Sequence, residues 1–248
     1  NSSTSSQKQF DSVVIGAGMS GLAAAIRLAM AGKSVTLLEQ HSVPGGLNSY
    51  YQRGKRKLDV GLHAMTNYME AGSKGKPLGK ILKQLRLRYH QLELVPQIKS
   101  KIHFPNQQLS FSNKLEVLKQ SIADQFPGQQ ENFEQLVEFA TQFNETSLEH
   151  QFTPAKEHLS QIVTDPLLLD MLITPLLLYG SANEDEMDLA QFVIMFKSIY
   201  LEGFMRPQGG VRTIINLLLS RLDQLGVKIE YRSKVEEIIS NNQVATAV

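Results

Sequence analysis

Two clusters of glycines and a single carboxylate stand near the start of this 248-residue chain at spacings that could bind a ligand. The glycines are Gly16, Gly18, Gly21, Gly45 and Gly46. Glu39 lies between the clusters, about twenty residues after Gly18. Glycine lets main-chain N–H groups come close to a ligand, and a carboxylate accepts hydrogen bonds from hydroxyl groups. These residue types predict a site that binds phosphate and sugar groups.

The elements around these residues form one predicted βαβ unit. Residues 10–16 are a β-branched run that stops at a glycine, which predicts a buried strand. Residues 19–31 are rich in helix formers and are followed by Gly32, a residue typical of the position after a helix end. Residues 33–39 predict a second buried strand that ends at Glu39. A strand, a helix and a parallel strand within about 30 residues form a βαβ unit.

Each residue of the first cluster has a predicted role in binding a dinucleotide. Gly16 permits the tight turn, Gly18 lets a pyrophosphate approach the backbone, and Gly21 lets helix and strand pack closely. Met19 and Ser20 open the helix, and their N–H groups and the helix dipole favour phosphate. At its position, Glu39 would accept hydrogen bonds from the ribose hydroxyls and disfavour a 2′-phosphate.

Several further segments carry a family resemblance. An NAD-binding unit would continue into another helix and strand, whereas this chain turns into the pair Gly45–Gly46. The segments that follow the family pattern are "EQHSVPGG" (39–46), "LDVGLHAM" (58–65), "LLLYG" (176–180) and the P-x-GG stretch within 200–239. Together they resemble the FAD-dependent phytoene desaturase, carotenoid isomerase and retinol saturase family, within the amine-oxidase-like flavoproteins.

The resemblance implies FAD as the cofactor and a set of residues that would bind it. In the family the glycine pair wraps the pyrophosphate, and the position of Val235 contacts adenine through its backbone. The predicted cofactor-binding set is Gly16, Ala17, Gly18, Met19, Ser20, Gly21, Glu39, Gln40, Gly45, Gly46, Leu47, Asn48 and Val235. Many relatives have arginine after the glycine pair, where this chain has Leu47 and Asn48. Either Arg53 or Arg56 replaces that cation, or both are solvated.

The resemblance also indicates residues that could act on a substrate. His63 would lie near the flavin, where it either exchanges a proton or is satisfied by the packing of its own loop. We expect Asp59 to brace main-chain N–H groups at the turn rather than to act as a base. Gly209 and Gly210 follow Pro207 and lie either beside the cofactor or in the loop before a helix. The sequence indicates no Ser-His-Asp set and no metal site.

The predicted fold is α/β: a Rossmann-like FAD-binding domain, split in sequence, with an inserted and mostly helical substrate or cap domain. We expect a disordered tail at 1–9, the FAD domain at 10–66 and 205–248, and the insertion at 67–204. The second part of the FAD domain looks truncated, so we expect a fragment or a shortened relative. Within the insertion, residues 77–88 predict an amphipathic helix, and Asn113 with Glu116 predicts a capping box for the next helix.

Composition limits the partners. The formal net charge is +1 and cysteine is absent, which fits a reducing compartment, so we expect a cytoplasmic protein. No segment has the length of a membrane span or the pattern of a signal peptide. Residues 53–88 contain ten Lys or Arg residues and only two acidic residues. These basic residues form either a solvated surface or a face for peripheral membrane contact. We expect no nucleic-acid partner, and the oligomeric state stays open.

The expected function is redox or isomerisation chemistry on C=C bonds of a lipophilic small molecule such as a carotenoid-like or retinoid-like polyene. Two alternatives remain open at this point: an amine- or protoporphyrinogen-oxidase-like flavoenzyme, and a truncated flavoprotein without catalytic activity.

Overall fold

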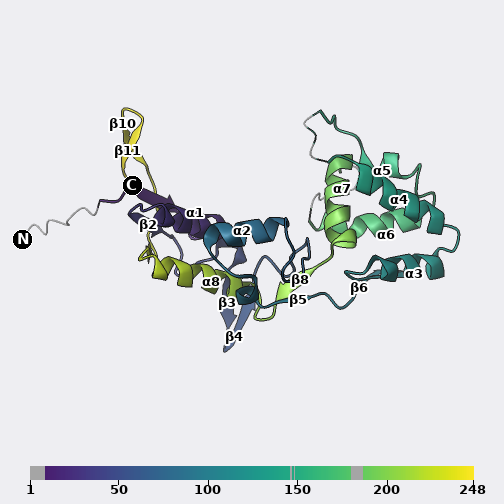
Figure 1. The fold of residues 1–248 in the computed structure, drawn as a ribbon, viewed down its shortest axis with the longest axis horizontal. Coiled ribbons are helices and arrows are strands. Elements are labelled where there is room, and N and C mark those ends of the chain that lie inside the picture. The colour runs from purple at the N-terminus through teal and green to yellow at the C-terminus, as the bar shows by residue number, and fades with distance from the viewer. Residues whose placement is uncertain (1–8, 146, 148, 180–186) are drawn as a thin grey trace, which may run out of the picture. The chain divides into compact units, whose positions relative to one another are not determined.

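The computed structural model describes residues 9–145, 147, 149–179 and 187–248 (Figure 1). Two compact units divide the chain. Unit 1 comprises residues 1–63, 71–94 and 206–248, and unit 2 comprises residues 64–70 and 95–205. Each unit has a hydrophobic core of its own.

Unit 1 is built on a three-stranded parallel sheet of β1 (Ser12–Ile15), β2 (Val35–Leu38) and β9 (Lys228–Glu230), in the order β1-β2-β9. Helix α1 (Met19–Met30) connects β1 to β2, and α8 (Val211–Gln224) leads into β9. The two helices contact each other, and both contribute to the core of this unit. This architecture confirms the predicted α/β class with a Rossmann-like parallel sheet.

Strand β1 is less buried than the sequence predicts. Leu37 of β2 is fully buried, but Val13 and Ile15 of β1 are 39% and 50% exposed. β1 lies at the edge of the sheet, and its side chains alternate between the two faces. Val14 packs against the core of unit 1, so Val13 and Ile15 point to the opposite face. The prediction of a buried strand was therefore wrong for this face of β1.

Several smaller elements complete unit 1. They are the 3-10 turns η1 (Gly46–Asn48) and η2 (Tyr89–Leu92), the strands β3 (Tyr50–Arg53), β4 (Arg56–Asp59), β10 (Ile239–Asn241) and β11 (Val244–Ala247), and helix α2 (Pro77–Leu85). The sequence places α2 in the insertion, whereas the structure groups it with unit 1. Leu85 of α2 joins the core of this unit, and α2 contacts α1.

Unit 2 consists mainly of helices. They are α3 (Leu115–Gln125), α4 (Gln130–Gln142), α5 (Ala155–Leu159), α6 (Pro166–Leu177) and α7 (Leu189–Phe196), followed by a π-helical turn, η4 (Lys197–Leu201). An antiparallel hairpin of β6 (Ser100–Phe104) and β7 (Gln107–Phe111) packs on α3. The strands β5 (Leu94–Pro96) and β8 (Met205–Pro207) pair with each other, and each spans a boundary of the units.

The core of unit 2 combines aliphatic side chains with a group of aromatic rings. Phe133, Phe196 and Tyr200 are almost fully buried, and their rings lie 5.3 to 6.3 Å apart. The hydroxyl of Tyr200 donates a hydrogen bond to the carbonyl of Leu172 at 2.9 Å, and burial raises the pKa of this hydroxyl far above its ordinary value. In the described ranges, no helix is long and apolar enough to cross a bilayer.

The predicted capping box of helix α3 is absent from the structure. The N-cap is Lys114, and its side chain makes no capping bond. Asn113 instead donates to the carbonyl of Phe204 and accepts from the N–H of Phe204, both at 2.8 Å. The prediction was wrong because a distant backbone segment offers Asn113 both a donor and an acceptor, which the start of the helix does not.

We expect Asn113→Ala to lower the free energy of unfolding by about 1.5 kcal/mol, because the N–H and C=O of Phe204 both lose their partner. Urea denaturation followed by circular dichroism measures this change. Asn106→Ala, in the exposed turn between β6 and β7, is the matched control and should change stability by less than about 0.5 kcal/mol. Equal effects of the two substitutions would contradict the role assigned to Asn113.

Candidate dinucleotide site

The first glycine cluster has a different local geometry at each position. Gly16 has a φ of +93°, a backbone conformation that favours glycine and forms the turn after β1. A Cβ added to Gly18 would meet nothing within 4 Å, so open space lies beside the N-terminus of α1. A Cβ on Gly21 would collide with the carbonyl oxygen of Gly16. The geometries of Gly16 and Gly21 match the predicted turn and tight packing, and the approach of a pyrophosphate to Gly18 stays a prediction.

The start of helix α1 offers main-chain donors to this open space. Gly18 is the N-cap and lacks a side chain that could accept from the first turn, which begins at Met19 and Ser20. No acidic residue lies in this first turn. The positive end of the helix dipole therefore acts together with these N–H groups, an arrangement that suits an anion such as a pyrophosphate.

Glu39 is a buried carboxylate at the end of β2, and it is hydrogen-bonded to the turn that follows β1. It is only 5% exposed, and its Oε2 accepts from the N–H of Ala17 at 2.6 Å. Its Oε1 accepts from the N–H of His41 at 2.8 Å. A carboxylate has about four acceptor positions, so this geometry leaves capacity for hydroxyl donors of a ribose. Gln40, the next residue, is exposed beside His41.

The segment that begins at the end of β9 closes the end of β2. The N–H of Glu39 donates to Glu230, and the N–H of Ser233 donates to the carbonyl of Glu39, both at 2.9 Å. Burial, and then the charge of Glu39, raises the pKa of the Tyr231 hydroxyl. The parallel pairing of β9 with β2 places these residues there.

The second glycine pair lies directly against the first cluster. The N–H of Gly45 donates to the carbonyl of Ala17 at 2.8 Å, and Gly45 forms a parallel bridge with Gly18. A Cβ on Gly46 would lie 3.3 Å from the Cα of Gly18. Gly45 and Gly46 have φ values of +114° and +56°, which favour glycine at both positions. The two clusters therefore form one continuous glycine-lined wall.

Asn48 connects this wall to the loop that carries His63. Its Oδ1 accepts from the N–H of Leu62 at 3.0 Å, and a Cβ on Gly61 would lie 2.8 Å from the same oxygen. His63 itself is exposed, and so is Leu47, at 86%. Asn48 thus positions a loop in this structure, while the roles predicted for His63 and Leu47 remain predictions.

An ion pair between Asp59 and Arg212 connects the loop that carries His63 to the start of α8. Arg212 Nε lies 2.7 Å from Asp59 Oδ1, and the two side chains are 30% and 11% exposed. Gly210 has a φ of +79°, and a Cβ there would collide with the carboxylate of Asp59. The guanidinium of Arg212 also lies 5.6 Å from the centre of the Tyr50 ring. The sequence predicts main-chain N–H groups as the partners of Asp59, and this prediction was wrong because Asp59 contacts the cation of Arg212. The sequence did not predict Arg212 as a partner, because no spacing rule pairs it with Asp59.

We expect Asp59→Asn to destabilise unit 1 by about 1.5 kcal/mol, because Arg212 then loses its partner charge in a partly buried position. A double-mutant cycle with Arg212→Gln, measured by urea denaturation, isolates the interaction energy. If the two substitutions are additive, the ion pair does not stabilise this loop.

The remaining predicted residues lie around this wall or outside it. Val235 lines an open cavity of about 410 Å³ together with Leu38 and Ser233, just beyond the end of β2. Pro207 and Gly209 belong to β8 and to the loop before α8, and a Cβ on Gly209 would meet the hydroxyl of Thr213. Arg53 and Arg56 are a cross-strand pair at the exposed tip of the β3–β4 hairpin. Residue 180, the glycine of the "LLLYG" segment, lies outside the described residues.

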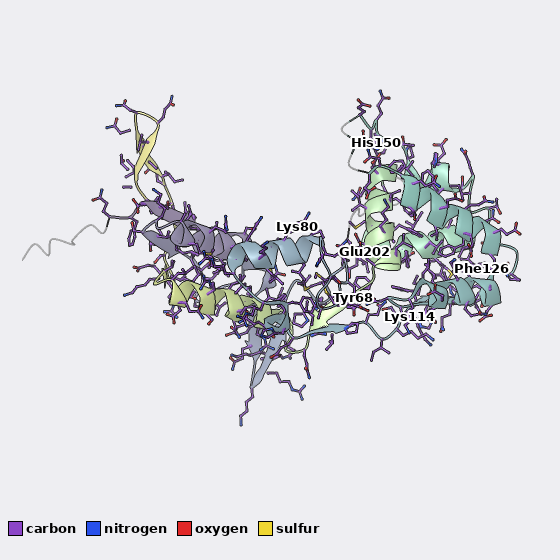
Figure 2. All side chains as sticks on the ribbon, viewed as in Figure 1. Tyr68, Lys80, Lys114, Phe126, His150 and Glu202 are labelled. Carbon is purple, nitrogen blue, oxygen red and sulfur yellow. The ribbon has the colours of Figure 1, made fainter. Side chains whose placement is uncertain are left out.

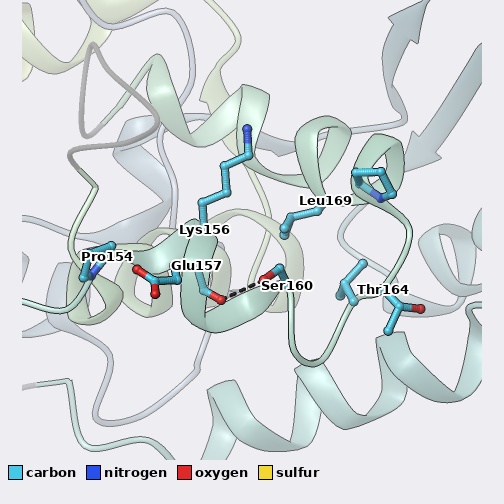
Figure 3. A pocket seen from close by; sticks show the side chains of 8 residues that line it. Pro154, Lys156, Glu157, Ser160, Thr164 and Leu169 are labelled. Atoms are coloured by element: carbon cyan, nitrogen blue, oxygen red, sulfur yellow. Dashed lines mark hydrogen bonds between the residues drawn. The ribbon is translucent and has the colours of Figure 1, made fainter.

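A separate surface cavity lies within unit 2 (Figure 3). It has a volume of about 490 Å³, and Pro154, Ser160 and Leu169 are among its lining residues. Ser160 Oγ donates to the carbonyl of Glu157 at 2.8 Å, and Lys156 pairs with Asp170 at 2.9 Å. The polar groups here contact protein atoms, and we assign no function to this cavity. Across the described part of the chain, no group of three His, Asp or Glu side chains is placed to hold a metal ion.

Comparison with known proteins agrees with the geometry of unit 1. Residues 14–85 match the family model of the NAD(P)-binding Rossmann-like domain. This chain contains a dinucleotide-binding Rossmann fold.

The curated relatives are enzymes. Prolycopene isomerase of Daucus carota is 24% identical over 97% of this chain and 43% of its own length. All-trans-retinol 13,14-reductase of Homo sapiens is 45% identical over 28% of this chain and 11% of its own length. The resemblance predicted from the sequence motifs is thereby confirmed. The chain spans less than half of the length of these relatives.

A solved structure supports the fold across nearly the whole chain. An oxidoreductase from Methanosarcina mazei superposes with a TM-score of 0.71 at 20% identity, over 94% of this chain and 54% of that chain. The likeness extends to both units, so the mostly helical insertion is part of the shared architecture. At this identity the comparison concerns the fold, and activity is inferred from the site.

Proposed function

We propose that this chain binds FAD and belongs to an enzyme that acts on carbon–carbon double bonds of a lipophilic polyene. The observation that carries the cofactor is the contact between the two glycine clusters. Gly45 is hydrogen-bonded to Ala17, and Gly46 packs on Gly18. The pair Gly45–Gly46, which follows β2 and Glu39, adds main-chain surface that a diphosphate could contact. The turn after β1 alone would offer less.

The residues present fit such a cofactor. The space beside Gly18 and the N–H groups at the start of α1 would hold the diphosphate. Glu39 would accept hydrogen bonds from the ribose, and the cavity beside Val235 would receive adenine. When bound, FAD would supply hydride exchange with a substrate carbon.

The loop from 58 to 63 would position the reacting end of the site. Asn48 holds this loop through Leu62, and the Asp59–Arg212 pair fixes its start against α8. His63, at the exposed end of the loop, would hold or move a proton at its imidazole. The substrate class follows from the homologues, since one is named for isomerising prolycopene and another for reducing retinol.

The cofactor proposal is tested by purifying the chain and recording its visible spectrum with and without added FAD. A yellow complex with one FAD per chain is the expected result. A colourless chain that ignores FAD but retains NAD would overturn the proposal.

The substrate proposal needs a separate measurement. The FAD-loaded chain is incubated with a cis-polyene or with a primary amine, and the products are separated by chromatography. A changed double-bond configuration or saturation of the polyene supports the proposal, and conversion of the amine alone would contradict it.

A further inference from the structure

The β3–β4 hairpin has one face that the candidate site does not use. Its strands pair with Tyr51 opposite Leu58 and Arg53 opposite Arg56. Because side chains alternate along a strand, these four residues point to the same side, and Val60 continues the row. We refer to Tyr51, Arg53, Arg56, Leu58 and Val60 as the hairpin face.

The opposite side of the hairpin contacts the rest of unit 1 near Tyr50 and Asp59, whereas Gln52 and Lys57 on that side are exposed. There, Lys57 Nζ lies 4.8 Å from the centre of the Tyr50 ring, and the guanidinium of Arg212 lies 5.6 Å from the same ring. Asp59 forms its ion pair with Arg212 on this side. The hairpin face therefore points outward, and its members are exposed: Tyr51 by 56%, Leu58 by 37% and Val60 by 39%.

The charge of this segment is strongly positive although the whole chain is nearly neutral. Arg53, Lys55, Arg56 and Lys57 lie around the turn at Gly54. Asp59 is the sole acid of residues 50–60, and it is paired with Arg212. Figure 2 shows nitrogen-ended side chains spreading from the tip of this hairpin.

We propose that the hairpin face docks unit 1 onto an anionic lipid surface. Its arginines would contact lipid phosphates, while Tyr51, Leu58 and Val60 would enter the headgroup region, where an aromatic ring and aliphatic side chains are stabilised. Aliphatic side chains beside the cations favour lipid over single-stranded nucleic acid, which is bound by stacking on several aromatic rings. The proposal goes beyond the redox function and does not depend on it.

The structure also separates two basic segments that are close in the sequence. Helix α2 carries the exposed residues Lys80, Ile81 and Lys83, but the tip of the hairpin points away from α2 (Figures 1 and 2). The basic residues between 53 and 88 therefore do not form a single face. Lys80 and Lys83 thus provide a matched control within the same unit.

Co-sedimentation of the whole chain with lipid vesicles tests the proposal. Vesicles of phosphatidylcholine alone are compared with vesicles that contain about 30% phosphatidylserine. We expect at least about 25-fold stronger binding to the anionic vesicles, and loss of that preference in about 0.5 M salt. Equal binding to both compositions would overturn the proposal.

Three double variants test which residues are responsible for vesicle binding. Arg53→Gln with Arg56→Gln should weaken binding to anionic vesicles about 25-fold, because each cation near such a surface contributes about fivefold. Tyr51→Ser with Leu58→Ser should weaken binding to anionic vesicles by a similar factor in low and in high salt, since the insertion of apolar side chains is not screened. Lys80→Gln with Lys83→Gln should change binding less than about twofold.

Three results would overturn the assignment to the hairpin face. They are unchanged vesicle binding in the arginine variant, an equal loss in the α2 variant, and tighter hairpin-dependent binding to a single-stranded oligonucleotide than to vesicles. Circular dichroism melting of each variant verifies that its fold is retained, so that a loss of binding reports on the surface.

Discussion

Gly21→Ala is expected to destabilise unit 1 by about 3 to 4 kcal/mol and to abolish dinucleotide binding. The new Cβ would collide with the carbonyl oxygen of Gly16, which is main chain and has no rotamer to change. Helix α1 would have to move away from β1, and its first N–H groups would leave the position that suits a diphosphate. Urea denaturation and titration with FAD measure the two effects.

Gly128→Ala is the matched control for this substitution. A Cβ at Gly128 would meet nothing within 4 Å, and its φ is not positive. Stability should therefore stay within about 0.5 kcal/mol of the parent chain. A Gly21→Ala variant as stable as Gly128→Ala would show that helix and strand do not depend on close contact at this point.

Glu39→Gln is expected to lower the free energy of unfolding by about 2 to 3 kcal/mol. The side chain is buried, and both of its oxygens accept from main-chain N–H groups, those of Ala17 and His41. An amide offers one oxygen, so its NH₂ group would face one of these donors. Because the same side chain would bind the ribose, FAD affinity should fall at the same time.

Glu70→Gln removes a carboxylate from an exposed position and serves as the control for charge and amide chemistry. Its stability should match that of the parent chain within about 0.5 kcal/mol. If Glu39→Gln retained full stability but lost FAD, the acid would serve the ligand alone. If it retained both, the role of Glu39 in joining the loop to β2 would be wrong.

The sequence by itself determined the βαβ unit and the places of its glycines and acid. These depend on local rules: the runs of apolar residues, the helix formers and the few backbone conformations open to glycine. Gly16 and Gly21 therefore have the geometry that their spacing predicts. The family resemblance came from further short segments, at 39–46, 58–65, 176–180 and 200–239.

Only the tertiary structure decided which distant groups meet. Asn113 binds the backbone of Phe204, and Asp59 pairs with Arg212, although neither partner is marked by a motif. Ile15 is exposed because it lies on the face of β1 opposite to the core, and Leu85 joins the core to which α1 also contributes. Such contacts join residues that are far apart in the chain, so no local propensity specifies them. Which residues become partners depends on how the helices and strands pack in the folded protein.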